Sequence, residues 1–138
     1  MRPRILRVQD AEGRGPYRPG FSAVWCDSFG PPPPMTWLEE FPHLGRRVRR
    51  LQREYGGAHF GCGCRTEQQI HTWFTPTERY RLAKLGFQLV AMHVDRILAE
   101  SPTQLVFLRE RPLTEGIEVL PLSDLRAVSA DKHTRESA

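Results

Sequence analysis

Alternating and continuous runs of apolar residues predict four strands along the chain. Residues 4–9 read as a first strand, and residues 87–94 are almost continuously apolar, as in a central strand covered on both faces. Segments 104–109 and 117–120 are bounded by proline and glycine and predict two more. We expect these strands to form a small, twisted sheet of mixed direction.

Three further segments have the signals of helices. In residues 44–55 apolar side chains recur every three or four positions. Thr66 to Gln69 and Thr75 to Glu78 are capping boxes, in which a threonine hydroxyl accepts a hydrogen bond from the third backbone N–H. Gly86 ends the last helix. Helices beside a sheet define an α+β fold.

The chain length fits one domain, which we predict over residues 1–125, with a short charged tail at 126–138. The prolines at 31–34 predict a stiff polyproline II spacer. We expect one shared core, made of large apolar side chains from several elements: Trp73, Phe74, Phe87, Leu89, Val106 and Phe107.

Composition adds a mildly basic character, with 20 Lys and Arg against 16 Asp and Glu, a net charge of +4. This balance allows an acidic partner without requiring one. No apolar run is long enough to span a bilayer, and the first residues lack the apolar stretch of a signal peptide. We therefore expect a cytoplasmic protein that keeps its three cysteines reduced.

Four residues of zinc-ligand type lie close together in the sequence: His59, Cys62, Cys64 and His71. A Cys-x-Cys pair is poorly spaced for structural zinc, so we expect no metal and favour a glycine-flanked strand. Cys64 also precedes the start of a helix, where a thiol pKa can fall, so it is a candidate nucleophile with His59 or His71 as base.

Arginines dominate two regions. In the 44–55 helix they occupy the side opposite the apolar residues, at Arg46, Arg49, Arg50 and Arg53. This face either binds phosphates or an acidic protein surface or is simply solvated. After the first strand a glycine-rich loop gathers residues suited to an anion such as pyrophosphate, namely Arg7, Gln9, Asp10, Arg14 and Arg18. The alternative is an ordinary structural loop.

Residues 4–22, 59–74 and 104–107 resemble uncharacterised small proteins of bacteriophages and prophages. More distantly, the layout resembles the ADP-ribosyltransferase fold. That family has an arginine on the first strand, a hydroxyl residue that opens a helix, and a polar residue on a late strand. The matching positions are Arg7, Thr66 and Gln104.

This resemblance implies that Arg7, Thr66 and Gln104 hold NAD and act in catalysis, and that the loop residues Gln9, Asp10, Arg14 and Arg18 help to bind the cofactor. The family has glutamate at the position of Gln104, and an amide lacks the charge that stabilises an oxocarbenium-like transition state. Glu100 could substitute, or the protein binds a nucleotide without catalysis.

Two functions follow. The first is a phage accessory protein in the host cytoplasm that transfers ADP-ribose from NAD to a host protein or nucleic acid. The second is a non-enzymatic, anti-defence inhibitor of the anti-CRISPR type, whose arginine helix blocks a host nuclease or its nucleic-acid site.

Overall fold

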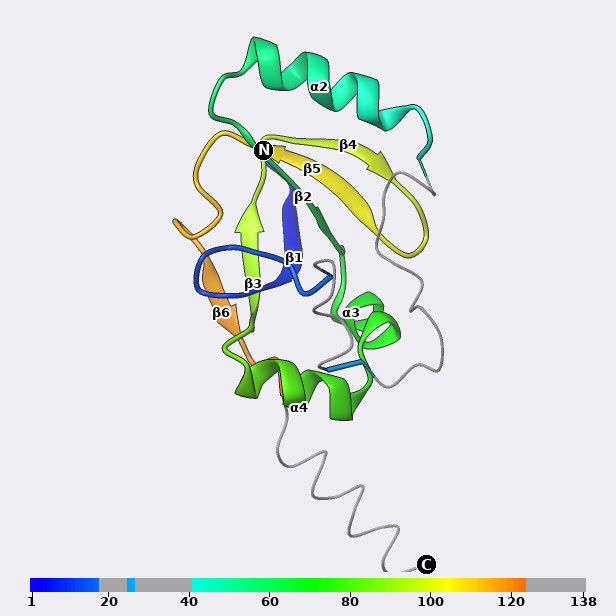
Figure 1. Ribbon diagram of the computed structural model, residues 1–138, viewed down its shortest axis with the longest axis vertical. Coiled ribbons are helices and arrows are strands. Elements are labelled where there is room, and N and C mark those ends of the chain that lie inside the picture. Colours follow the sequence, from blue (N-terminus) through cyan, green and yellow to red (C-terminus); the bar gives the residue numbers. More distant parts are fainter. Residues whose placement is uncertain (18–24, 27–40, 124–138) are drawn as a thin grey trace, which may run out of the picture.

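The computed structural model describes residues 1–17, 25–26 and 41–123 (Figure 1). Within this part the chain forms six strands and three helices, in agreement with the predicted α+β class. The elements in chain order are β1 (Arg4–Gln9), α2 (Leu44–Glu54), β2 (His59–Gly63), α3 (Glu67–Trp73), α4 (Pro76–Lys84), β3 (Gln88–His93), β4 (Arg96–Glu100), β5 (Leu105–Arg109) and β6 (Glu118–Leu120). The predicted polyproline spacer and the tail lie outside the described residues.

The strands form two three-stranded sheets, in the orders β1-β3-β6 and β2-β5-β4. All their pairings are antiparallel, so the expectation of a single sheet of mixed direction was wrong. The second sheet contains β2 and β4. At β2 the sequence predicted a strand only as the alternative to a metal site, and at β4 it predicted no strand. The hairpin of β4 and β5 is joined by too short a segment for a parallel crossover.

The first strand and the two capped helices were predicted closely. Strand β1 spans the predicted residues, and both Thr66 and Thr75 form complete capping boxes at the starts of α3 and α4. Gly86 has a φ of +93°, a conformation that a residue with a side chain rarely adopts, and it follows Leu85, the C-cap of α4. Strand β3 is buried on both faces in the middle of its sheet, as its continuous apolar run indicated.

Three hydrophobic clusters replace the single predicted core. Phe74, Phe87 and Leu89 pack in one cluster with Trp73 at its margin, Phe107 lies in a second, and Val106 lies in a third beneath α2. The separation follows from strand geometry, because successive side chains of β5 point to opposite faces of the sheet. Val106 and Phe107 therefore cannot share a core.

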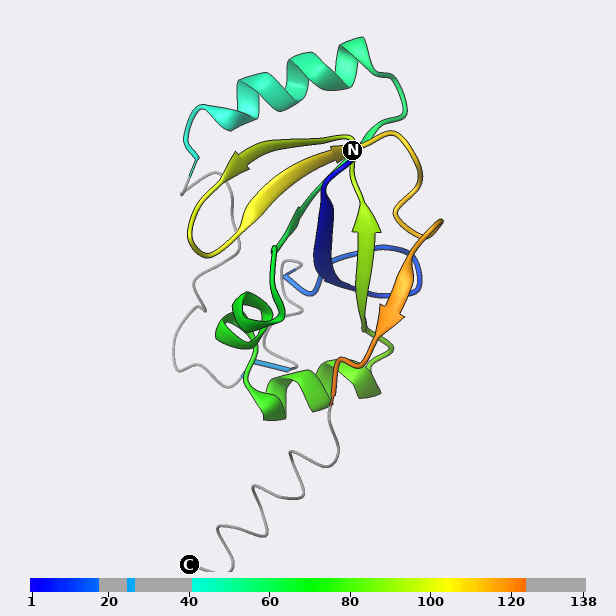
Figure 2. The same ribbon diagram turned by 180° about the vertical axis from the view of Figure 1, so that it is seen from behind.

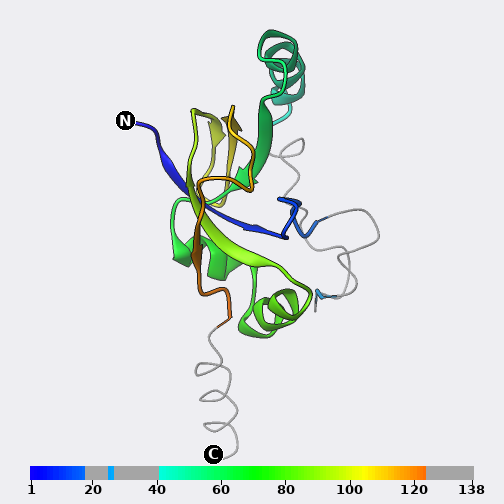
Figure 3. The same cartoon turned by 90° about the vertical axis from the view of Figure 1, so that its left-hand side faces the viewer.

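Figures 2 and 3 show α2 along one side of the molecule, over the β2-β5-β4 sheet, with α4 at the opposite end. The two sheets meet where β1 passes β2. There Leu6 and Cys64 exchange two backbone hydrogen bonds of 2.8 Å each. This bridge sets the position of the candidate site.

Candidate functional site

A pocket of about 240 Å³ opens beside the bridge between the two sheets. It takes its walls from β1, from the loop after β1, from β2 and from α3. The lining residues are Arg7, Val8, Gly15, Pro16, Tyr17, Gly61, Cys62, Gly63, Cys64, Ile70 and Phe74. Most of this surface is apolar side chain or peptide backbone, which suits a flat ligand with a few polar groups.

Arg7 is the charged group of the pocket, and it is half-buried. Its Nε donates to Gln9 Oε1 at 3.0 Å, its Nη1 to the Cys62 carbonyl oxygen at 2.8 Å, and its Nη2 to the Gly13 carbonyl oxygen at 3.1 Å. Burial lowers the pKa of the guanidinium, although Cys62 and Asp10 partly oppose this effect. The group stays charged, and two of its five N–H donors have no acceptor among the described residues.

Glycines make room for this guanidinium. A Cβ atom on Gly61 would lie 3.0 Å from Arg7 Nη1 and 2.9 Å from the ring of Phe107, closer than real side chains pack. A Cβ on Gly63 would lie 2.8 Å from the Leu6 carbonyl oxygen. Strand β2 can approach β1 this closely only because both positions lack a side chain. Sequence reasoning treated these glycines merely as strand flanks.

Aromatic rings form the other wall. Tyr17 stacks on Phe74 with ring centroids 5.9 Å apart, and its edge meets Trp25 and Trp73 at 5.2 and 6.3 Å. Burial raises the pKa of the Tyr17 hydroxyl, with smaller contributions from Cys26, Glu78 and Cys64. The phenol is therefore neutral at physiological pH. Sequence reasoning missed Tyr17, whose only signal was its place in the glycine-rich loop.

The predicted cofactor-binding residues mainly organise the loop. Gln9 is 1% exposed and bonds Arg7 through Oε1 and the Leu113 carbonyl through Nε2. The Asp10 carboxylate accepts from the backbone N–H groups of Glu12 and Arg14 and from Arg14 Nε, each at 2.9 Å. Burial alone would raise the pKa of Asp10, but these bonds hold it below its usual value. Arg18 lies outside the described residues.

Of the three predicted catalytic residues, only Arg7 lines the pocket. The Thr66 hydroxyl accepts from the Gln69 backbone N–H at 3.2 Å in the capping box. Gln104 lies just before β5 and is 2% exposed. Glu100, the substitute carboxylate, forms two hydrogen bonds of 2.7 and 2.9 Å with Arg65, and these hold the pKa of Glu100 below its usual value.

Cys64 does not have the properties of a nucleophile. Cys64 is fully buried, and burial is the main cause that raises the pKa of its thiol to about 12. The expectation of a lowered thiol pKa at the helix start was therefore wrong, because burial outweighs the helix end. In the described part of the chain no three His, Cys, Asp or Glu side chains gather where they could hold a metal ion, and no disulfide joins the cysteines.

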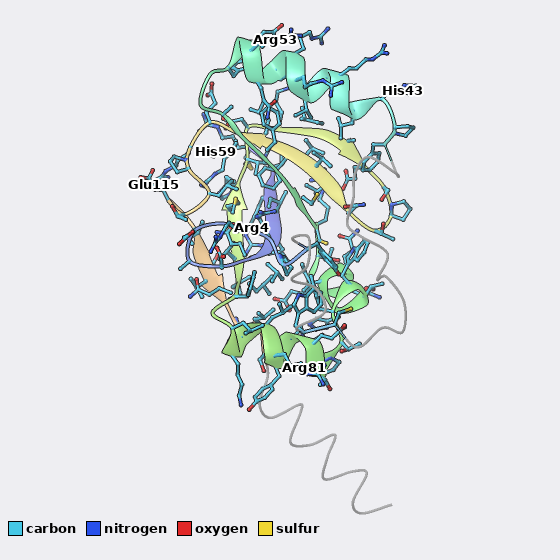
Figure 4. The ribbon with its side chains drawn as sticks, viewed as in Figure 1. Arg4, His43, Arg53, His59, Arg81 and Glu115 are labelled. Atoms are coloured by element: carbon cyan, nitrogen blue, oxygen red, sulfur yellow. The ribbon has the colours of Figure 1, made fainter. Side chains whose placement is uncertain are left out.

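The arginine face of α2 is a second candidate site. Arg46, Arg49, Arg50 and Arg53 are all exposed, while Leu44, Val48 and Leu51 are buried against the sheet. Figure 4 shows Arg53 at one end of the helix, directed away from the body of the protein, and His43 at the other end. Arg47 is not part of this face, and it donates from Nη1 to the Leu98 carbonyl at 3.0 Å.

Comparison with known proteins shows the family to which the chain belongs. The sequence model of the bacteriophage T4 Y00F protein family matches residues 1–119. The chain belongs to this phage protein family. No curated protein and no solved structure matches the chain.

The matched residues include the whole pocket and the arginine face, so both candidate sites lie in the part of the chain that the family shares. The predicted resemblance to small phage proteins is thereby confirmed.

Among the described residues no helix has the length and apolar character needed to cross a membrane.

Proposed function

We propose that this phage protein binds NAD through the Arg7 pocket and acts as an accessory protein in the host cytoplasm, on an ADP-ribosyltransferase-like scaffold. The observation that carries the proposal is the position of the Arg7 guanidinium. It comes from the first strand, lies where two small antiparallel sheets meet, and faces a pocket walled by peptide backbone and aromatic rings.

The size and chemistry of the pocket suit one end of the dinucleotide. A volume of about 240 Å³ holds a single ring with part of a ribose rather than the whole molecule. The Tyr17 ring offers a stacking surface for nicotinamide, and the remaining N–H donors of Arg7 can serve an amide or phosphate oxygen.

Transfer of ADP-ribose is the candidate reaction. The bond between the ribose C1′ and the nicotinamide nitrogen breaks, nicotinamide leaves with the electron pair, and a nucleophile of the target bonds to C1′. The cationic transition state calls for a nearby negative charge. The described lining of the pocket holds no carboxylate, and Thr66 and Gln104 neither line it nor carry a negative charge, so Glu100, which is paired with Arg65, is the charge that would have to assist. Nucleotide binding is the step to test first.

Isothermal titration calorimetry with NAD, ADP-ribose and nicotinamide tests the proposal. Replacement of Arg7 by Ala should weaken binding by about tenfold to a hundredfold, because a hydrogen bond to a charged group contributes about 1.5 to 3 kcal/mol. Arg4→Ala is the matched control, since Arg4 lies on the same strand but is exposed and paired with Glu118. Absence of binding to the wild-type protein at millimolar ligand would refute the proposal.

A second candidate function comes from the exposed arginines of α2. Here the protein is a non-enzymatic inhibitor that covers an acidic surface, either of a host defence nuclease or at its nucleic-acid site. Capture of a partner from host lysate should be sensitive to salt and lost on reversal of two arginines to Glu. Equal capture by that variant would indicate a merely solvated face.

A further inference from the structure

The exposed face of α2 carries charge without any apolar anchor. Its exposed side chains are Arg46, Arg49, Arg50, Gln52, Arg53 and Glu54. Protein interfaces usually combine arginines with buried aromatic anchors at their centre. Contacts to a nucleic-acid backbone need none, because arginine bonds phosphate oxygens directly.

Most of this positive charge has no neutralising partner among the residues that the structure describes. Arg50 lies 4.0 Å from Glu54, at the limit of an ion pair, while Arg46, Arg49 and Arg53 have no ion-pair partner in the described part of the chain. The first turn of α2 contains no acidic residue, and the side chain of His43 makes no capping hydrogen bond. The positive end of the helix dipole therefore adds to the arginine charge.

The arginines also have a suitable spacing. Arg46 and Arg53 are two turns apart, so the stripe extends about 10 Å along the helix axis. A nucleic-acid duplex carries about six phosphates over that length.

We propose that the arginine face of α2 binds the phosphate backbone of nucleic acid, without reading its sequence. This inference rests on the second candidate function, and it commits that function to the nucleic acid rather than to the acidic surface of a nuclease. The protein then acts by occupying the nucleic acid that a host enzyme needs.

Fluorescence polarisation with a labelled 20-base-pair duplex and a labelled single strand, between 50 and 200 mM KCl, tests the proposal. For the duplex, four phosphate contacts predict a slope of log K against log salt of about −3.6, or about a hundredfold loss of affinity over this range. Arg46→Gln with Arg49→Gln should reduce the slope to about −1.8. The control Arg4→Gln with Arg111→Gln removes the same charge from exposed positions outside α2 and should leave the slope nearly unchanged.

The outcomes distinguish failure of nucleic-acid binding from failure of the second candidate function. No binding of either nucleic acid at 50 mM KCl, or equal slopes for the two double variants, would overturn the nucleic-acid proposal. If the wild-type protein nevertheless captures a protein from host lysate that has been cleared of nucleic acid with nuclease, and the α2 variant does not, the arginine face binds protein. If the wild-type protein binds neither nucleic acid nor a host protein, the second candidate function is rejected as a whole. Thermal melts of each variant verify folding.

Discussion

Arg7 Nη1 donates a hydrogen bond of 2.8 Å to the carbonyl oxygen of Cys62, and this bond joins the first strand of one sheet to the first strand of the other. The same guanidinium also holds the loop through Gly13. Arg7, which was predicted to contact a cofactor, therefore also stabilises the fold by linking the two sheets. Loss of Arg7 should affect stability and binding together.

The first prediction concerns the effect of Arg7 on stability, which is measured without ligand. Arg7→Ala should lower the free energy of unfolding by about 1.5 to 3 kcal/mol, because the Cys62 and Gly13 carbonyl oxygens lose a charged donor. Urea unfolding measures this change, with Arg4→Ala as the exposed control. An unchanged urea midpoint would mean that water replaces the guanidinium at no cost, and that Arg7 is free to serve a ligand alone.

Glycine at position 61 should be required for the approach of β2 to β1. Gly61→Ala would place a methyl group 2.9 Å from the Phe107 ring, and overpacking of this kind costs about 1 to 3 kcal/mol. Gly56→Ala is the matched control, because no atom lies within 4 Å of its added methyl group. Equal urea midpoints for the two variants would contradict the packing described here.

Phe87 should contribute strongly to the core despite its place just outside a strand. It is 4% exposed, and truncation of a large buried ring costs about 3 to 5 kcal/mol. Leu85→Ala offers a comparison two residues away, since Leu85 is 44% exposed. Chemical denaturation of Phe87→Ala and Leu85→Ala should give clearly different midpoints; similar losses would argue against the cluster.

The buried Cys64 thiol predicts a decline of stability in alkali. Its folded-state pKa is raised from 9.0 to about 12, so below pH 9 the thiol is protonated in both states and the shift has no effect. Between pH 9 and 12 the unfolded chain loses the proton while the folded protein keeps it, so stability falls as pH rises. By pH 10 the loss from this group is about 1.4 kcal/mol.

Urea midpoints at pH 8 and pH 10 measure this decline. Cys64→Ala should lose less stability over the interval than the wild type. A decline of the same size in Cys64→Ala and in the wild type would assign the effect to other groups, such as the Tyr17 phenol, whose pKa burial also raises.

Gln104→Glu tests the chemistry. The substitution supplies the carboxylate that the resembled family uses, so release of nicotinamide from NAD should increase if the residue reaches the ribose. Burial will raise the pKa of the new carboxyl group, so the activity should increase with pH as the group ionises. Nicotinamide release is measured by chromatography, with Gln104→Ala as control. Unchanged turnover despite measurable NAD binding would leave a binding protein without transferase activity.

Local signals in the sequence were sufficient for some elements and not for others. The threonine caps of α3 and α4 depend on residues three positions apart, so the sequence contained all that was needed. Strand β2 was harder, because glycine is unfavourable in strands and its presence here is explained only by Leu6, Arg7 and Phe107, which are distant in the sequence.

The candidate site shows the same division. Arg7 was singled out with the glycine-rich loop and through the family resemblance, and it lines the pocket. The arginine face of α2 was predicted from its periodicity, and its side chains are exposed. The aromatic wall of Tyr17 and Phe74 could not be predicted, since it depends on how the loop after β1 folds over α3. The raised pKa of Cys64 likewise results from burial by several separate elements, which a single segment cannot reveal.

The antiparallel pairing of β1 with β3 has a consequence for the synthesis of the protein. Arg4 pairs with His93 and Gln9 with Gln88, so the first strand leaves the ribosome long before its partner exists. Strand β2 must likewise wait for β5. Such distant pairings are slow to form. The capped helices α3 and α4 can form during translation, but β1 and β2, which form two walls of the pocket at Arg7, gain their sheet partners only after β3 and β5 have emerged.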